Sequence, residues 1–268
     1  MEMDKINKAL KLIEASASIT GSAVGVAAGG LLAGPPGAFA GALAGASITE
    51  ILKYIGSEMY DRKLSMGERE MARIGAALVY SIEKIHSNVM LGLRVREDDF
   101  FSKTDKSKLS KAEELLEGTL SKAKSCYEEK KVKYIGNIYG NLPFFAFIDS
   151  YMAYQLINFA ERLTYRQLCI MAMIKKIEEY NLSQEDYRGS KQINVQLAFL
   201  LREIVELMDL NLGHVIQKNN TDSEVIFGLT DISPGRLRLN PLGNSLYLVM
   251  SLDEIEDEDI NRVVSLFR

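Results

Sequence analysis

The sequence contains no tryptophan, only two cysteines and only two histidines among 268 residues. Cys126 and Cys169 lie far apart, and His86 and His214 belong to different regions of the chain. No spacing among these residues matches a zinc site or a disulfide framework. So few residues also leave few ways to build a Ser/His/Asp or Cys/His catalytic group. Both cysteines are therefore expected to be reduced core residues.

Other signatures of catalysis are also missing. The chain has no His-Glu-x-x-His and no Gly-x-Ser-x-Gly sequence, and its glycine-rich stretches lack the Gly-Lys-Ser/Thr ending of a phosphate-binding loop. The acidic run Glu97-Asp98-Asp99 offers carboxylates to a divalent cation, but neighbouring residues on a helix point in different directions, which favours a solvated run. We therefore predict no enzyme activity, no catalytic or metal-binding residues and no cofactor.

The chain also has no excess of basic over acidic residues. The formal net charge is −4, and 47% of the residues are hydrophobic and 25% charged. Such a composition is that of globular proteins with a real core, which excludes wholesale disorder. An acidic chain of this kind is a poor match for a generic phosphate-binding surface. Nucleic acid is therefore not an expected partner.

Charge is entirely missing from Ala15–Thr49, between Glu14 and Glu50. Within this segment small residues recur every four positions, a step that keeps them on one helix face. A face without bulky side chains lets two backbones approach closely, as in helices that associate in lipid. The residues predicted to form this packing face are Gly21, Gly25, Gly29, Gly37, Gly41 and Gly45.

Pro35-Pro36 interrupts the glycine pattern and predicts a turn, because proline cannot continue a helix and restricts the residue before it. Two helical arms then form a hairpin, and the first arm, Ala15–Ala33, is about 28 Å long, close to a hydrocarbon core of about 30 Å. Both outer ends are flanked by basic residues, as expected if both lie on the cytoplasmic side. These residues are Lys5, Lys8, Lys11, Lys53, Arg62 and Lys63.

The hairpin is only weakly hydrophobic, since eight of its 35 residues are Ile, Leu, Val or Phe. Alanine and glycine contribute little insertion free energy. A hairpin packed on its own domain is therefore one alternative, and a cleaved signal peptide is another. The acids Glu2, Asp4 and Glu14 and the double proline disfavour the signal peptide. Weak hydrophobicity also suits a segment that inserts only after oligomerisation.

The middle of the chain, residues 61–162, is predicted to be a helical domain. Ser65 and Glu68 form a capping box, and Ser110 with Glu113 forms a second one. Lys122–Lys133 is expected to be one charged, solvated helix. Ile135–Phe147 is aromatic and apolar, which indicates core beneath a helix junction or, as the alternative, a lipid-facing or partner-facing patch.

In residues 163–268 three helices precede a β-hairpin. Thr164 and Gln167 form a capping box that begins the first helix. A short helix is expected at Ser183–Tyr187 and a third at Asn194–Asp209. Strands are expected at Glu224–Leu229 and Leu237–Leu239, followed by a helix over Pro241–Met250. An acidic tail ends in a small amphipathic helix, for which Ser251 and Glu254 supply a capping box.

This order, together with Arg236–Gly243, resembles a winged helix-turn-helix over roughly 163–250. The resemblance implies that the third helix, Asn194–Asp209, reads a DNA major groove. That helix departs from the family, because its single cation, Arg202, faces three acids in a largely apolar sequence. We therefore expect the module to contact protein or to dimerise.

The expected fold class is mainly α, in three parts: a glycine-zipper helical hairpin (1–60), a helical domain (61–162) and a winged-helix-like α+β module with an acidic C-terminal helix (163–268). This architecture resembles membrane-acting effectors of bacterial toxin and antiviral systems. The resemblance implies a cytoplasmic protein that associates with membrane through its hairpin, forms homo-oligomers and disrupts the membrane after self-assembly. A protein-interaction or regulatory protein with the hairpin buried in a homo-oligomer is the alternative, and a DNA-binding regulator is the third.

Overall fold

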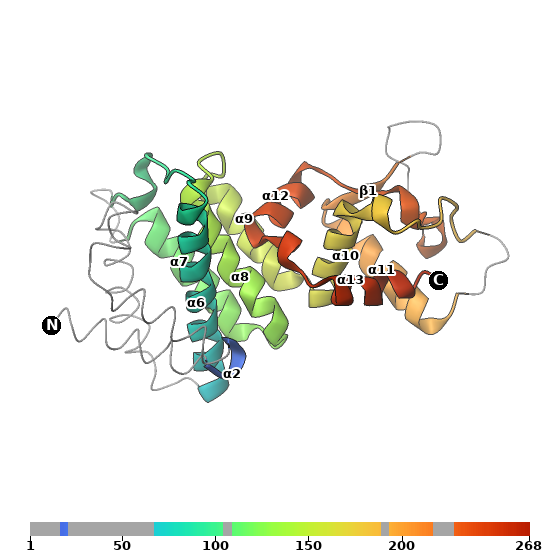
Figure 1. Cartoon of the computed structure of the whole chain (residues 1–268), viewed down its shortest axis with the longest axis horizontal. Coiled ribbons are helices and arrows are strands. Elements are labelled where there is room, and N and C mark those ends of the chain that lie inside the picture. Colours follow the sequence, from blue (N-terminus) through green and yellow to red (C-terminus); the bar gives the residue numbers. More distant parts are fainter. Residues whose placement is uncertain (1–16, 21–66, 104–108, 189–192, 217–227) are drawn as a thin grey trace. The chain divides into compact units, whose positions relative to one another are not determined.

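The computed structural model describes residues 17–20, 67–103, 109–188, 193–216 and 228–268. These residues form a mainly helical protein, as predicted, and the only sheet among them is one pair of short strands. The chain divides into two compact units, Met1–Arg162 and Leu163–Arg268 (Figure 1). Each unit is described separately below.

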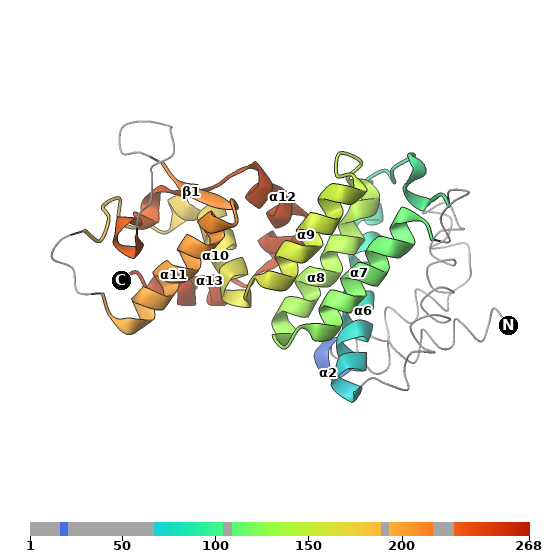
Figure 2. The ribbon, with the colours of Figure 1, turned by 180° about the vertical axis from the view of Figure 1, so that it is seen from behind.

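The N-terminal unit is built on four described helices that alternate in direction. Contacts between helix ends set the directions: Asn88 near the end of α6 bonds to Asn141 at the end of α8, whereas Arg73 near the start of α6 bonds to Lys124 near the end of α7. The elements are α2 (Ala17–Thr20), α6 (Glu68–Met90), η3 (Asp99–Phe101), α7 (Lys111–Ser125), α8 (Glu129–Asn141), η4 (Leu142–Phe144) and α9 (Ser150–Arg162). Figure 2 shows the same bundle from behind.

Helices α6 and α8 cross at very close range because α8 presents glycine to its neighbour. A Cβ on Gly136 would lie 2.5 Å from the carbonyl oxygen of Ala77, and one on Gly140 would lie 2.6 Å from Cβ of Lys84. The Ser81 hydroxyl donates across the crossing to the carbonyl oxygen of Gly136 (2.8 Å). The crossing therefore depends on the same four-residue glycine spacing as the N-terminal segment, here in a helix with a charged first turn.

Local capping chemistry sets where two of these helices begin. Ser110 accepts from the amide of Glu113, whose carboxylate accepts from the amide of Ser110, so this predicted capping box is confirmed. The predicted Ser65 box is wrong in register. The N-cap of α6 is Gly67, whose amide donates to the Glu70 carboxylate at 2.9 Å.

The expected single helix over Lys122–Lys133 is also wrong. The helix is interrupted at residues 126–128, between α7 and α8, where the Cys126 side chain is buried. Lys131 is 5% exposed rather than solvated, and its ammonium donates to the carbonyl oxygen of Glu161 (3.0 Å). Tertiary contacts to α9 therefore override the local preference for a continuous helix.

The aromatic stretch Ile135–Phe147 is core through most of its length, which was the favoured prediction. Ile135, Tyr139 and Pro143 are buried in the bundle. Only its end turns outward, where Phe147 is 61% exposed.

The C-terminal unit is organised around α10 (Tyr165–Lys175), in which Gln167–Ile174 are all buried. The Thr164 hydroxyl accepts a hydrogen bond from the amide of Gln167, and the Thr164 amide donates one to the side-chain oxygen of Gln167. This predicted capping box is confirmed. Around α10 lie η5 (Ile177–Glu179), α11 (Val195–Asp209), β1 (Gly213–Val215), η6 (Leu229–Asp231), η7 (Pro234–Arg236), β2 (Leu237–Leu239), α12 (Pro241–Met250), η8 (Leu252–Glu254) and α13 (Asp257–Ser265).

The acidic tail packs on its own unit. Helix α13 lies against α10, and the Tyr165 hydroxyl donates to the Asp259 carboxylate (2.8 Å). The predicted capping box at Ser251 is wrong, because Ser251 has the left-handed backbone conformation and the N-cap of α13 is Glu256.

Two further predictions for this unit are corrected. The segment Ser183–Tyr187 is not helical, because its backbone bonds to the segment before β2: Gly235 donates to Ser183, and Tyr187 donates to Thr230. The predicted strand Glu224–Leu229 lies mostly outside the described residues, and Leu229 itself begins η6. The antiparallel partner of β2 is β1, with Gly213 opposite Leu239.

Candidate functional site

The residues predicted to carry function lie outside the described residues. They are Gly21, Gly25, Gly29, Pro35, Pro36, Gly37, Gly41 and Gly45. What the structure does describe is where the chain enters and leaves their segment. No helix among the described residues is both long enough and apolar enough to cross a membrane.

The described residues stop at Thr20 and resume at Gly67. Helix α2 packs against α6. Both views place it beside the first turns of α6, which begin just after Gly67 (Figures 1 and 2). The two boundaries of the segment 21–66 therefore lie at one end of the helical bundle.

Ionic contacts tie the helices together at this end. Arg69 on α6 pairs with Glu129 on α8 (3.0 Å), and Lys122 on α7 pairs with Glu161 on α9 (2.5 Å). Lys124 lies 4.0 Å from the Glu70 carboxylate. The pairs are partly exposed, so each contributes little stability. Their main effect is to gather charged side chains from four helices on one surface.

We call this surface the basic end and define it as residues 67–73, 121–133 and 158–162. Segment 121–133 carries five lysines and two glutamates, and the other two segments are each electrically balanced, so the basic end has a net charge of +3 in a chain of net charge −4. Tyr127, at the tip of the α7–α8 turn, is 79% exposed.

The opposite end of the bundle is held by a buried arginine that sequence reasoning missed. The Arg96 side chain is 4% exposed, and its guanidinium donates to the carbonyl oxygen of Ile148 (3.0 Å) and to both oxygens of Asp98. It also stacks over the Phe100 ring, 4.5 Å from the centroid. The hydrogen bond that Arg96 donates to the Asp98 carboxylate lowers the pKa of Asp98.

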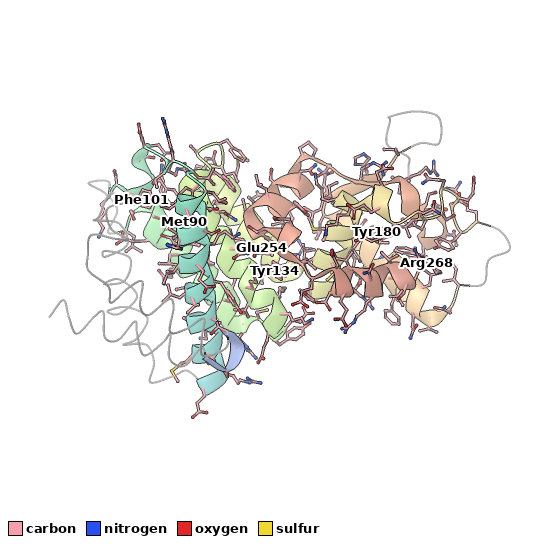
Figure 3. The ribbon with its side chains drawn as sticks, in the orientation of Figure 1. Met90, Phe101, Tyr134, Tyr180, Glu254 and Arg268 are labelled. Atoms are coloured by element: carbon pink, nitrogen blue, oxygen red, sulfur yellow. The ribbon has the colours of Figure 1, made fainter. Side chains whose placement is uncertain are left out.

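Large apolar side chains are exposed around this second end. Met90 is 73% exposed where α6 finishes, and it lies at that end of the unit together with Phe101 (Figure 3). The exposed residues that we group as the apolar end are Met90, Leu91, Leu93, Phe147, Tyr151 and Met152. Single exposed apolar residues are ordinary, but a gathering of this kind is typical of contact surfaces.

The acidic run at this end is neutralised by neighbouring cations. Asp98 is bonded to Arg96, and Asp99 accepts from the Lys111 ammonium at 2.8 Å. Within the described ranges, no group of three or more His, Cys, Asp and Glu side chains is arranged to hold a metal ion. The contacts of Asp98 and Asp99 with Arg96 and Lys111 hold the loop between α6 and α7.

In the C-terminal unit, α11 exposes an apolar and acidic face. Val195 is 72% exposed and Phe199 is 63% exposed. Arg202, the one cation of the helix, pairs with Glu206 (3.3 Å). Such a face offers little to a DNA backbone, whose phosphates bind unpaired cations.

Both cysteines are buried thiols, one in each unit. Burial raises the pKa of the Cys126 thiol, so its reactive thiolate is scarce at neutral pH. We expect native Cys126 to react with iodoacetamide at pH 7.5 more than tenfold more slowly than in the urea-unfolded chain. Mass spectrometry of the labelled peptides measures both rates. Equal rates would show that the α7–α8 turn opens freely.

The basic end and the Arg96 contacts could not be found from sequence alone. Each joins segments that are distant along the chain. The charged stretch Lys122–Lys133 indicates part of the first, and Arg94–Phe101 indicates part of the second. Comparisons with protein-family models, with curated proteins and with solved structures gave no match to this chain. Its function must therefore be argued from its own residues.

Proposed function

We propose that the protein is a non-enzymatic, cytoplasmic, membrane-associating protein whose segment Ala15–Thr49 inserts as a glycine-zipper hairpin. The helical unit holds the hairpin, and the C-terminal unit brings copies or partners together. Self-assembly of the hairpins then disrupts the membrane. This is the action expected of a bacterial toxin or antiviral effector.

The proposal is carried by the absence of charge from Ala15–Thr49. The described residues on either side of 21–66, which holds most of that segment, lie at one end of a folded bundle. A hairpin that enters and leaves a bilayer on the same side requires its two ends to be close together. The glycines at four-residue intervals supply the packing face, and Pro35-Pro36 supplies the turn.

The proposal assigns contact with protein to the C-terminal unit, which we retain as a winged-helix-like module although the predicted helix at Ser183–Tyr187 is absent. Two strands pair after α11 and lead directly into α12, whose N-cap Asn240 accepts from the amide of Gly243 (3.0 Å). The exposed Val195 and Phe199 on α11 suit an apolar partner. We do not extend the proposal to DNA, because α11 has no cation beyond the paired Arg202.

Membrane fractionation of full-length variants tests insertion. Wild-type protein is expected to stay in bacterial membranes after a carbonate wash. Val26→Asp places a charge near the middle of the first arm, at a cost of about 3 kcal/mol or roughly 100-fold in insertion. We expect this variant to leave the membrane, while the matched control Val26→Leu stays. A chain beginning near Ser57 is also expected in the supernatant.

Disruption by assembly is tested separately from insertion. Gly25→Leu and Gly41→Leu keep the segment apolar but fill its packing face. These variants are expected to remain in carbonate-washed membranes and to lose permeabilisation, measured by dye entry into cells. Full solubility of the wild-type protein would contradict constitutive insertion and favour the alternative, a homo-oligomer that buries the segment. Unchanged dye entry would contradict assembly through the glycines.

A further inference from the structure

We propose that the basic end is a docking surface for anionic membrane lipids, which it contacts through its solvent-accessible lysines and Tyr127. This inference rests on the proposed function in one respect: insertion of the hairpin decides which end of the bundle faces the bilayer. It adds a peripheral, electrostatic contact with the headgroups to the insertion of the hairpin.

The first argument is that the basic end lies beside both described boundaries of segment 21–66. These boundaries, Thr20 and Gly67, are at the end of the bundle where α6 begins. The same end holds the α7–α8 turn, because Arg73 on α6 bonds to the backbone of Lys124 (3.3 Å). A bilayer that receives the charge-free part of segment 21–66 therefore faces the basic end.

The second argument is charge. The basic end has a net charge of +3, while the described residues of the opposite end carry four cations against six acids. The residues counted there are Arg94, Arg96, Glu97, Asp98, Asp99, Lys103, Lys111, Glu113, Glu114 and Asp149. The described residues of the unit are thus more positive at one end of the bundle than at the other. An anionic leaflet attracts the basic end and repels the other, which orients the bundle upright on the surface.

The third argument is the exposed aromatic. Tyr127 is 79% exposed at the tip of the turn, between Lys124 and Lys130. Tyrosine is favoured at membrane interfaces, because its ring enters the headgroup region while its hydroxyl stays hydrated. The ring is largely free of contacts with the folded unit, and a headgroup layer would provide contacts for it.

The test uses full-length protein and two matched double variants. Lys124→Gln with Lys130→Gln removes two charges from the basic end, and Lys103→Gln with Lys111→Gln removes two from the opposite end of the same unit. Flotation with phosphatidylcholine vesicles, with and without phosphatidylserine, measures binding. Since each lysine near an anionic surface contributes about fivefold, the first pair is expected to weaken phosphatidylserine-dependent binding roughly 25-fold, and the second pair less than about twofold.

Tyr127→Ser is expected to weaken binding further, and rising salt to abolish the lysine-dependent part. Equal losses in the two double variants, or no phosphatidylserine dependence in the wild type, would overturn the proposal. The Val26→Asp background separates it from insertion. In that background the lysine-dependent binding to vesicles is expected to persist although carbonate releases the protein. If the proposal on insertion fails, lysine-dependent flotation still tests this one.

Discussion

Replacing Gly136 and Gly140 together by alanine is expected to destabilise the N-terminal unit by about 4 kcal/mol, roughly 2 kcal/mol for each overpacked position. The new methyl on residue 136 would lie 2.5 Å from a backbone oxygen of α6, which cannot rotate away as a side chain can. Helices α6 and α8 would have to separate. Separation would also break the bond from Ser81 to the carbonyl of residue 136.

The control is the same substitution at Gly118 on α7, where an added Cβ meets nothing within 4 Å. Alanine there is expected to stabilise the helix by about 0.5–1 kcal/mol, because glycine loses more backbone entropy on folding. Urea titration followed by pulse alkylation reads the two units separately, through Cys126 in one and Cys169 in the other. Loss of protection at Cys169 as well as Cys126 would contradict a crossing that is local to the N-terminal unit.

The crossing of α6 and α8 shows that a four-residue glycine interval does not by itself indicate a membrane helix. Gly136 and Gly140 have the four-residue interval of the N-terminal glycines, yet α8 begins with Glu129, Lys130 and Lys131 and belongs to a charged bundle. The interval therefore indicates close helix packing, not lipid. The prediction of membrane insertion depends instead on the absence of charge from Ala15–Thr49.

Features set by neighbouring residues were predictable from the sequence. The caps at Ser110, Thr164 and Asn194 each use a side chain that bonds to an amide three residues later, so the signal is local. The helices that follow Ser110 and Thr164 were predicted from these caps, whereas the cap at Asn194 was not singled out. Helix α12 begins at Pro241, where its missing amide donor costs nothing.

Features set by distant contacts were not predictable. The break at residues 126–128 lies between charged stretches of helix formers; Cys126 is buried there, and Lys131 in the next helix bonds to α9. Ser183–Tyr187 has the composition of a helix start, but its backbone bonds to Thr230 and Gly235. The excess of lysine in 121–133 is visible in the sequence, but the placement of this segment beside 67–73 and 158–162 depends on contacts between distant residues.

Replacing Arg96 by methionine is expected to destabilise the N-terminal unit by about 3 kcal/mol, the second largest effect that we anticipate. The change keeps an apolar stem but leaves the carbonyl oxygen of Ile148 without its donor in a place from which water is largely excluded. It also removes the cation from the face of Phe100. Arg96→Lys is expected to recover only part of the loss, because an ammonium cannot reproduce the two-pronged contact with Asp98.

The variant Asp98→Asn measures what the ion pair of Asp98 with Arg96 contributes, separately from the other contacts of Arg96. The Asp98 carboxylate is 41% exposed, so solvent screens its attraction to Arg96, and we expect its loss to cost much less than that of the arginine. Because the folded pKa of Asp98 lies below its usual value, its contribution is present above about pH 4 and is lost as pH falls through the folded pKa. Urea titrations at pH 7 and pH 3 should therefore differ less in Asp98→Asn than in wild type. An equal cost for Arg96→Met and Asp98→Asn at pH 7 would instead assign the stability to the ion pair, and not to the arginine's bonds with the backbone.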